Sequence, residues 1–264
     1  MLLKIEDLSV SFRNEEGEVT AAAVDVNLTL DRGEVLGIVG ESGSGKSSVA
    51  LSVPRLLPSP PAFWPKGSIL LDGADVLTMP LEDLRRLRGK RIGVVFQDPM
   101  GSLSPLHRIG DQLVETVLLH EQVSAKAARD LALEWLGKVG IPDPAVRAQA
   151  FPHELSGGMQ QRVMIAMGLM LEPDLLIADE PTTALDVTIQ AQVLKLMKTL
   201  HRANSAVLLI THDLGVVSQL ATRLAVMREG RVVETSDNPE EFFNNPKHPY
   251  SRALTGEARR MELT

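Results

Sequence analysis

Residues 40–47 read G-E-S-G-S-G-K-S, a glycine followed by four other residues and then by Gly-Lys-Ser. A short apolar run at 34–39 precedes this stretch and predicts a buried strand, while residues 47–53 suit a helix. Glycines in such a unit let successive backbone N–H groups converge on phosphate oxygens at the positive end of the helix. Lys46 would then reach the β and γ phosphates, and Ser47 would ligate Mg²⁺. The spacing therefore predicts a nucleotide site, in preference to a flexible Gly/Ser loop that happens to precede a lysine.

Pro54 limits the helix that follows this loop. A proline inside a helix removes the hydrogen bond to the carbonyl group four residues earlier, here that of Ala50. We therefore expect the helix to kink or end early near Pro54, with the loop itself intact.

The composition is that of an ordinary folded protein with one large core or two lobes: 264 residues, 44% of them hydrophobic and 23% charged. Because the sequence has no cysteine, disulfides and thiol-based metal or redox chemistry are excluded. A formal net charge of −7 gives no overall attraction to nucleic acid. The basic run at 84–91 lacks interleaved aromatic residues and is interpreted as a solvated surface segment.

We expect neither a membrane span nor a signal peptide from this sequence. Its apolar stretches are too short to cross a bilayer, and the N-terminus M-L-L-K-I-E-D lacks the long apolar region of a signal peptide. Any association with a membrane is therefore expected to go through a protein partner.

The N-terminal part is predicted to form β structure. Residues 3–12 are strand-like, and residues 24–30 alternate apolar and polar side chains, the period of a half-buried antiparallel strand. Prolines at 58–65 indicate a loop, and a β stretch follows at 67–71. An aromatic side chain such as Phe12 can stack on an adenine ring near a phosphate loop, but spacing alone favours core packing.

The middle of the chain changes from strand to helix. Residues 92–96 predict another buried strand, which ends at Gln97; a glutamine in this position can ligate a metal, orient water or merely cap the strand. A loop rich in Pro, Ser and Gly follows at 98–105. Residues 106–171 then have a helical pattern, and Ser124 is predicted to cap one of the helices. This pattern indicates a helical insert in an α/β core.

Residues 155–162 read L-S-G-G-M-Q-Q-R and lead into an apolar run. Ser156 is a predicted N-cap with two glycines in the first turn, which leaves the positive end of the helix open to an anion. Taken alone, this pattern also fits a capped core helix. Two anion-ready helix starts in one chain, however, indicate one nucleotide held from two sides.

Two further strands are predicted to end in candidate catalytic residues. L-L-I-A at 175–178 predicts a buried strand that delivers Asp179 and Glu180 at its carboxyl end, where ligands bind in open α/β sheets. Since neighbouring residues point to opposite faces, Asp179 is expected to hold Mg²⁺ and Glu180 to polarise the attacking water. Another strand, at 207–210, is followed by His212.

These motifs in this order, with A-L-D at 184–186, resemble the nucleotide-binding subunits of ATP-binding-cassette (ABC) transporters over essentially the whole chain. L-S-G-G-M-Q-Q-R is the most specific of them, because other phosphate-loop ATPases lack it. The resemblance implies a single α/β domain over 1–264. Its parts are a phosphate-loop ATPase core, an N-terminal antiparallel β subdomain, a helical subdomain at about 106–171 and a C-terminal tail at about 236–264.

The resemblance also implies an ATPase that uses ATP and Mg²⁺, with a role for each motif. Phe12 becomes the adenine-stacking aromatic, Gln97 links Mg²⁺ to a contact with a membrane subunit, and His212 is a γ-phosphate switch. The implied catalytic residues are Glu180, His212, Lys46 and Gln97, and the implied metal ligands are Ser47, Gln97 and Asp179. The implied nucleotide-binding residues are Phe12, Gly40, Ser42, Gly43, Gly45, Lys46, Ser47, Ser48, Ser156, Gly158 and Asp186.

A narrower likeness concerns the transported cargo. F-Q-D-P-M-G-S-L-S-P at 96–105, Met159 and H-P-Y-S-R-A-L at 248–254 resemble importers of dipeptides, oligopeptides and nickel. Many peptide-type members continue beyond H-P-Y with a cysteine-rich extension, whereas this sequence stops ten residues after Leu254 and has no cysteine. This departure favours the shorter nickel or metallophore type.

The likeness implies a set of partners. Two different ATPase subunits would sandwich two ATP molecules, with Ser156 and Gly158 of one completing the site of the other, and closure would drive two membrane permeases. A solute-binding protein outside the membrane would deliver the cargo, no nucleic acid would be bound, and the chain would lie peripherally on the cytoplasmic face of the bacterial inner membrane. The transported molecule itself is not readable from this subunit.

The alternative is an ABC ATPase without a transport role. A chromosome-maintenance ATPase needs a long coiled coil between Gln97 and Leu155, and that stretch is too short for one. Soluble ATPases that act on ribosomes usually carry two cassettes in one chain, and here there is one set of motifs.

Overall fold

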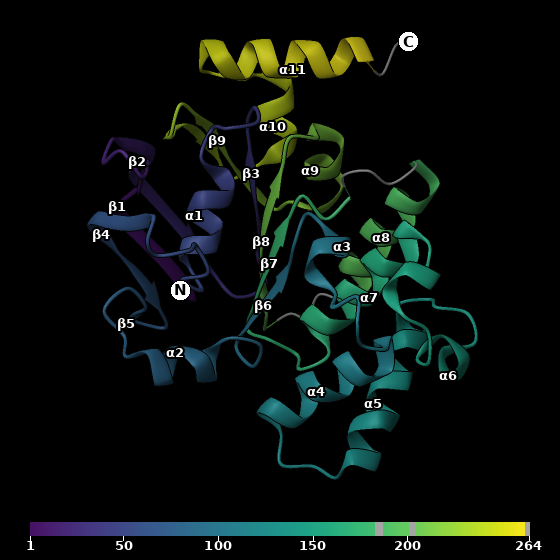
Figure 1. Ribbon diagram of the computed structural model, residues 1–264. Coiled ribbons are helices and arrows are strands. Elements are labelled where there is room, and N and C mark those ends of the chain that lie inside the picture. The colour runs from purple at the N-terminus through teal and green to yellow at the C-terminus, as the bar shows by residue number, and fades with distance from the viewer. Residues whose placement is uncertain (183–186, 201–203, 262–264) are drawn as a thin grey trace. The chain divides into compact units, whose positions relative to one another are not determined.

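The computed structural model describes residues 1–182, 187–200 and 204–261 of the chain. The chain divides into two compact units, which are described separately and with the labels of Figure 1. The first unit is made by 1–84 with 202–264, and the second by 85–201.

An antiparallel sheet with strand order β2-β1-β4-β5 opens the first unit. The predicted alternation along its second strand is confirmed, since Val26, Leu28 and Leu30 are buried while Asp25 and Asn27 are exposed. This is the pattern of a strand with one face on the core. The strands are β1 (Leu3–Arg13), β2 (Val19–Leu30), β4 (Ala62–Leu71) and β5 (Ala74–Asp75).

The strand β4 begins earlier than the prolines at 58–65 indicate. It starts at Ala62 and contains Pro65, near the point where its pairing with β1 shifts register between Ser9 and Ser11. A proline has no N–H for the sheet ladder, and a bulge is one of the few places in a sheet that tolerates it. The loop interpretation is therefore wrong from Ala62 onward.

A second set of strands in this unit carries the glycine-rich loop. The fully buried β3 (Val35–Val39) lies between β8 (Ala206–Thr211) and β9 (Arg223–Arg228) and is parallel to both, while β10 (Arg231–Ser236) pairs antiparallel with β9. Nearly continuous apolar strands such as β3 and β8 are typical of parallel sheets. Because parallel strands end at the same edge, the loop after β3 and His212 after β8 emerge together.

The helix after the loop ends as predicted, since α1 stops at Ser52, two residues before Pro54. Two further helices follow β10 at the C-terminal end of the described chain (Figure 1). The helices of the first unit are α1 (Lys46–Ser52), α9 (Leu214–Leu220), α10 (Pro239–Asn244) and α11 (Pro249–Met261), while α2 (Leu81–Leu87) spans the boundary between the units.

The second unit contains the parallel pair β6 (Ile92–Val95) and β7 (Leu175–Asp179) and most of the helices. The predicted cap at Ser124 is confirmed, because its Oγ accepts a hydrogen bond from the N–H of Ala127 at 3.2 Å. The helical elements are α3 (Pro99–Ser102), α4 (Ile109–His120), α5 (Ala125–Lys138), α6 (Pro144–Arg147), η1 (Pro152–Glu154), α7 (Gly157–Leu169) and α8 (Val187–Leu200).

The helices of the second unit pack through apolar stripes. Along α5 the buried residues Ala128, Ala132 and Leu136 recur every four positions, and α4 buries Leu113 and Val117 in the same way. This spacing places each set on one helix face. The helical region expected between 106 and 171 thus supplies its own small core, while its boundaries remain a prediction.

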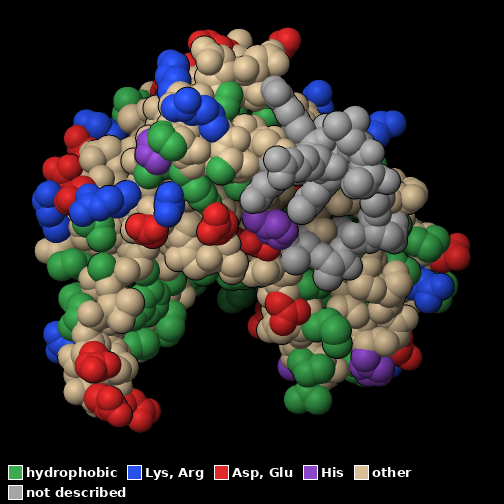
Figure 2. Space-filling model, turned by 90° about the horizontal axis from the view of Figure 1, so that it is seen from above, with side chains coloured by type: hydrophobic (Ala, Val, Ile, Leu, Met, Phe, Trp, Pro, Cys, Tyr) green, Lys and Arg blue, Asp and Glu red, His purple; other side chains and the backbone are tan. Residues whose placement is uncertain are grey.

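The surface carries charges of both signs. On the face shown in Figure 2, acidic and basic side chains lie interspersed among apolar ones. Within the described parts of the chain, no helix combines the length and apolar character needed to cross a membrane.

Candidate functional site

The loop between β3 and α1 is packed so closely that two of its glycines leave no room for a side chain. A Cβ atom at Gly40 would lie 2.1 Å from the carbonyl oxygen of Met227, and one at Gly45 would lie 2.1 Å from that of Ala22. Gly45 also has a φ of 96°, which residues with a Cβ rarely adopt. The loop is therefore held between β9 and β2, in a form that only glycine permits.

Lys46 is folded into this loop, with 4% of its surface exposed. Its Nζ donates hydrogen bonds to the carbonyl oxygens of Gly40 at 2.8 Å and Glu41 at 2.7 Å, and contacts Oγ of Ser44 at 3.3 Å. A buried ammonium group needs such acceptors to offset its lost hydration. Phosphate oxygens are charged and would be stronger acceptors than these neutral groups. Lys46 is therefore suited to leave the loop oxygens and bind a phosphate instead.

The remaining predicted residues of the loop lie around Lys46. Ser42 and Gly43 are exposed, and Ser47 and Ser48 are half-buried in the first turn of α1. Hydroxyl and backbone groups are therefore accessible on both sides of the lysine.

Phe12 and His212 belong to the same unit as the loop. Phe12 is half-buried in β1, opposite Thr20 of β2, and Ala22 of that strand is the residue that touches Gly45. His212 directly follows β8, whose last residue lies opposite the residue that precedes the loop. The first unit thus gathers the loop and His212 at one sheet edge and brings β1 near the loop through β2.

Gln97 and Glu180 meet in the second unit. The two residues follow the paired strands β6 and β7, and Nε2 of Gln97 donates a hydrogen bond to Oε2 of Glu180 at 3.1 Å. Asp179, the last residue of β7, is only 5% exposed, whereas the φ of 44° at Glu180 turns the chain out of the strand direction. The adjacent carboxylates therefore lie in different surroundings.

Ser156 caps α7, as predicted. Its Oγ accepts from the N–H of Met159 at 3.4 Å. A Cβ atom at Gly158 would come within 2.9 Å of Ile189, whereas a Cβ at Gly157 would meet no atom of the described chain within 4 Å. Packing among the described residues thus accounts for the glycine at 158 but gives no reason for the one at 157.

Gln160 was not singled out from the sequence, yet it holds the turn that leads into α7. It is buried, and its Nε2 donates to the carbonyl oxygens of Pro152 at 2.9 Å and Leu155 at 3.1 Å. The signal was present in the spacing, because Val163 and Met164, three and four positions later, are apolar and share its helix face. A polar residue on such a face needs buried partners.

Gln160→Ala is expected to lower the free energy of unfolding by about 1–3 kcal/mol, because the substitution removes the side-chain donor to the Leu155 carbonyl and one of the two donors to the Pro152 carbonyl, which also accepts from the N–H of Leu155. Urea denaturation of the full chain measures the change. Gln122→Ala, at an exposed glutamine, is the matched control and should change the free energy by less than about 0.5 kcal/mol. Equal effects of the two substitutions would contradict the assigned role of Gln160.

The metal ligands expected from the sequence are few. In the described chain, no group of three or more His, Asp or Glu residues is placed so that it could hold a metal ion. Magnesium in nucleotide sites is commonly held by one or two protein ligands together with phosphates and water, so Ser47 and Asp179 remain adequate candidates. Asp186, the last predicted nucleotide-binding residue, lies outside the described residues.

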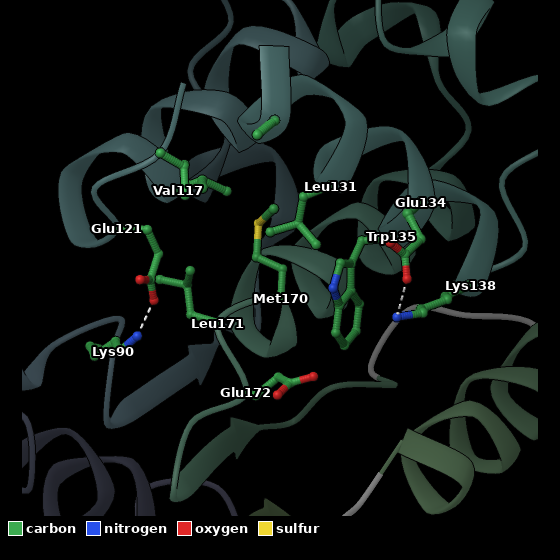
Figure 3. A pocket seen from close by; sticks show the side chains of 12 residues that line it. Lys90, Val117, Glu121, Leu131, Glu134, Trp135, Lys138, Met170, Leu171 and Glu172 are labelled. Atoms are coloured by element: carbon green, nitrogen blue, oxygen red, sulfur yellow. Dashed lines mark hydrogen bonds and ion pairs between the residues drawn. The ribbon is translucent and has the colours of Figure 1, made fainter. Parts of the chain in front are cut away.

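A surface hollow of about 400 Å³ lies in the second unit, against α4, α5 and the end of α7. Figure 3 shows Leu131, Trp135 and Met170 lining it, with the ion pair Lys90–Glu121 at its rim. None of the residues predicted for the nucleotide site lines this hollow.

Residues 23–183 match the family model described as ABC transporter. The oligopeptide transport ATP-binding protein OppD of Bacillus subtilis is 51% identical over 254 residues, which cover 96% of this chain and 70% of OppD. The dipeptide transport ATP-binding protein DppD of the same species is 48% identical, with 99% and 78% covered. The peptidoglycan transport ATP-binding protein YejF of Agrobacterium fabrum is 52% identical, but the chain spans 46% of its length.

Solved structures give the same fold. A dimeric ATP-binding cassette in a post-hydrolysis state, bound to ADP and Pi, superposes with a TM-score of 0.80 at 28% identity, over 89% of this chain and 98% of that one. A dimeric bacterial ABC transporter cassette matches with a TM-score of 0.79, also at 28% identity. The predicted fold class, an α/β core with an antiparallel β subdomain and added helices, is confirmed.

Proposed function

The chain belongs to the ABC transporter family, and we propose that it is the ATP-hydrolysing subunit that powers peptide import through a membrane transporter. One observation carries the proposal: about half of the residues are identical to those of transport ATP-binding proteins over nearly the whole chain. That extent of identity favours a transport ATPase over a non-transport ATPase of the same family.

The loop at 40–47 is suited to the phosphates of ATP. Lys46, already paired with three oxygen atoms, would bind the β and γ phosphates, and the hydroxyl of Ser47 with the carboxylate of Asp179 would hold Mg²⁺. Bound Mg²⁺·ATP supplies the phosphoryl group to be transferred, whose charge the lysine helps to neutralise. Phe12 would stack on the adenine, and the remaining predicted contacts are Ser42, Gly43, Ser48 and Asp186.

Glu180 would orient the attacking water and accept its proton. The Nε2 group of Gln97 donates its hydrogen bond to the carboxylate of Glu180. The amide oxygen Oε1 of Gln97, which is an acceptor, could then bind a cation. Gln97 would thus connect the position of Glu180 to that of the metal. His212, at the carboxyl end of β8, would sense the γ-phosphate.

A second ATPase subunit would complete the site through the start of α7. No atom of the described residues lies within 4 Å of a Cβ built at Gly157, which supports this role, because glycine is favoured where another molecule approaches the backbone closely. Ser156 and Gly158 of this chain would then face the nucleotide of the partner. We propose that the partner is a paralogous subunit, as the likeness to importers with two different ATPases implies.

The loop at 98–105 would contact a permease. Asp98 caps α3 by accepting from the N–H of Met100, and this short helix displays Met100 with 69% of its surface exposed. Leu106, just after the loop, is 81% exposed. Exposed apolar side chains on a loop that begins at Gln97 fit a contact that transmits closure of the nucleotide site.

Ser102→Cys is expected to form a disulfide cross-link with single cysteines placed along the cytoplasmic loops of the permeases. The chain has no cysteine of its own, so every disulfide cross-link to it involves the introduced cysteine. Ser218→Cys, at an equally exposed serine of α9, is the control and should give no cross-link. Failure at every permease position, with the complex assembled, would contradict the contact.

The proposed cargo and location are those of a peptide importer. Peptides are favoured over the nickel chelates that the short tail suggested, because the relatives described above are named for peptides or peptidoglycan. The complex would include two permeases and a solute-binding protein, with this chain peripheral on the cytoplasmic face of the inner membrane.

Purification of the tagged chain from membranes should recover those subunits, and peptide-loaded binding protein should stimulate ATP hydrolysis. Recovery without permeases would favour the non-transport alternative.

A further inference from the structure

The tyrosine of the H-P-Y segment touches the glycine-rich loop. The hydroxyl oxygen of Tyr250, in the first turn of α11, accepts a hydrogen bond from the backbone N–H of Glu41 at 3.0 Å. That N–H belongs to the same planar peptide unit as the carbonyl group of Gly40. Since this carbonyl accepts from Nζ of Lys46 at 2.8 Å, the two groups hold one peptide plane from opposite sides.

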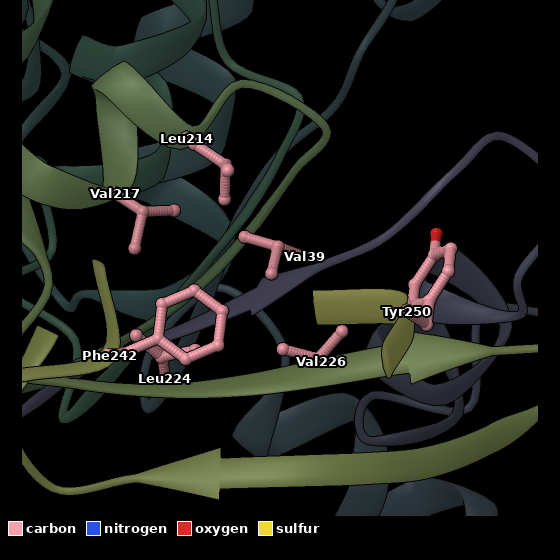
Figure 4. Close-up of a cluster of buried hydrophobic side chains, with 7 residues drawn as sticks. All are labelled: Val39, Leu214, Val217, Leu224, Val226, Phe242 and Tyr250. Carbon is pink, nitrogen blue, oxygen red and sulfur yellow. The ribbon is translucent and has the colours of Figure 1, made fainter. Parts of the chain in front are cut away.

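The ring of Tyr250 is fixed by the core of the first unit. It is 7% exposed and belongs to a cluster of buried side chains from β3, α9, β9, α10 and α11, drawn in Figure 4. The guanidinium of Arg228 lies over the ring, 5.1 Å from its centre. Val39, which directly precedes the loop, is part of the same cluster. The hydroxyl is therefore aimed at the loop by a side chain with little freedom to move.

The segment that carries Tyr250 is also held in place. Both carboxylate oxygens of Glu234 on β10 accept backbone hydrogen bonds, one from Lys247 at 2.9 Å and one from His248 at 2.8 Å. Burial acts to raise the pKa of Glu234, but these N–H donors, together with the Ser251 side chain and the charge of His248, outweigh it and keep that pKa below its usual value. Nδ1 of His248 in turn accepts from the N–H of Tyr250 at 3.2 Å. The carboxylate of Glu234 on β10 thus fixes the backbone just before α11, and with it the position of Tyr250.

We infer that Tyr250 is a positioning residue for nucleotide binding: its hydroxyl group keeps the Gly40–Glu41 peptide in the orientation that binds phosphate. The inference rests on the proposed phosphate-binding role of residues 40–47. To reach a phosphate, Lys46 must release the carbonyl oxygens of Gly40 and Glu41, after which the hydroxyl of Tyr250 is the remaining identified anchor of that peptide plane. The C-terminal segment thereby becomes part of the phosphate loop's support.

Tyr250→Phe tests this role, because it removes the hydroxyl and keeps the ring. The dissociation constant for ATP without turnover and the KM for ATP should each rise about three- to tenfold, since the nucleotide must then order the peptide itself. The kcat at saturating ATP should stay within about twofold of the wild-type value, since the bound nucleotide restores the loop. An unchanged dissociation constant would overturn the inference.

Two further variants of the full chain separate the possible causes. Phe242→Leu removes packing from the same cluster without touching the loop, so it should lower the melting temperature and leave the dissociation constant unchanged. An equal loss of affinity in Phe242→Leu would reduce Tyr250 to a packing residue and overturn the inference. Lys46→Ala should lose ATP binding altogether; if it binds ATP normally, the proposed phosphate loop is wrong, which is a different failure.

A measurement without a substitution in the cluster completes the test. Tyr250 is the single tyrosine of the sequence, so biosynthetic 3-fluorotyrosine gives one ¹⁹F resonance. Titration of the full chain with a non-hydrolysable ATP analogue should shift this resonance with the same midpoint as binding measured independently. A resonance that does not respond at saturation would also overturn the inference.

Discussion

Glu180→Gln is expected to lower the rate of ATP hydrolysis by a factor of about a hundred or more and to leave the affinity for ATP near the wild-type value. The substitution removes the carboxylate that is proposed to accept a proton from water, and it leaves the Lys46 contacts in the other unit untouched. Glutamine has the same shape and tolerates the φ of 44° at this position as glutamate does, so the backbone is preserved. Steady-state hydrolysis and nucleotide affinity, measured in the assembled transporter, check both parts.

The control for this variant is Glu16→Gln, the same chemical change at an exposed residue of the β1–β2 turn. It should leave hydrolysis unchanged. Hydrolysis near the wild-type rate in Glu180→Gln would contradict the proposed catalytic role of Glu180.

Lys46→Ala is expected to abolish vanadate trapping of nucleotide on this chain, whereas Ser156→Ala is expected to weaken trapping on the partner subunit. The first change removes the ammonium group that the loop encloses, and the second removes a hydroxyl from the helix start that would face the partner's nucleotide. Photo-crosslinkable ATP with vanadate, read subunit by subunit after gel separation, distinguishes the two patterns.

Each of these variants has a matched control in the chain. Ser124→Ala removes the same kind of helix cap from α5, at a similar cost of about 0.5–2 kcal/mol, and should leave trapping on both subunits unchanged. Lys126→Ala removes an exposed lysine and should do the same. If Ser156→Ala affected only the labelling of this chain, the proposal that Ser156 completes the nucleotide site of the partner would be wrong.

Local signals in the sequence predict most of the strands, but they do not predict the elements that follow His212, which are α9, β9, β10, α10 and α11. The glycine spacing at 40–47, the cap at Ser124 and the alternation in β2 each act over a few residues, so periodicity and capping chemistry suffice to predict them. The start of β4 could not be predicted in this way, because the pairing with β1 and the bulge that tolerates Pro65 are tertiary features.

In the candidate site, too, single residues could be predicted from local sequence, whereas contacts between distant residues could not. The glycine spacing before a helix predicts the role of Lys46, and positions next to strand ends predict those of Gln97 and Glu180. The hydrogen bond between Gln97 and Glu180 was not predicted, since the residues lie far apart in the chain. Tyr250 was visible only as part of H-P-Y, because its partner, the N–H of Glu41, is a backbone group 209 positions away and carries no sequence signal.

ATP-driven uptake by the purified complex tests the central proposal most directly. Proteoliposomes that contain the complex, with ATP at the side of this subunit and a labelled oligopeptide with its binding protein at the other, should accumulate the peptide. Complexes with Glu180→Gln should not, while those with Glu16→Gln should match the wild type. Accumulation that is independent of ATP, or unaffected by Glu180→Gln, would contradict the account.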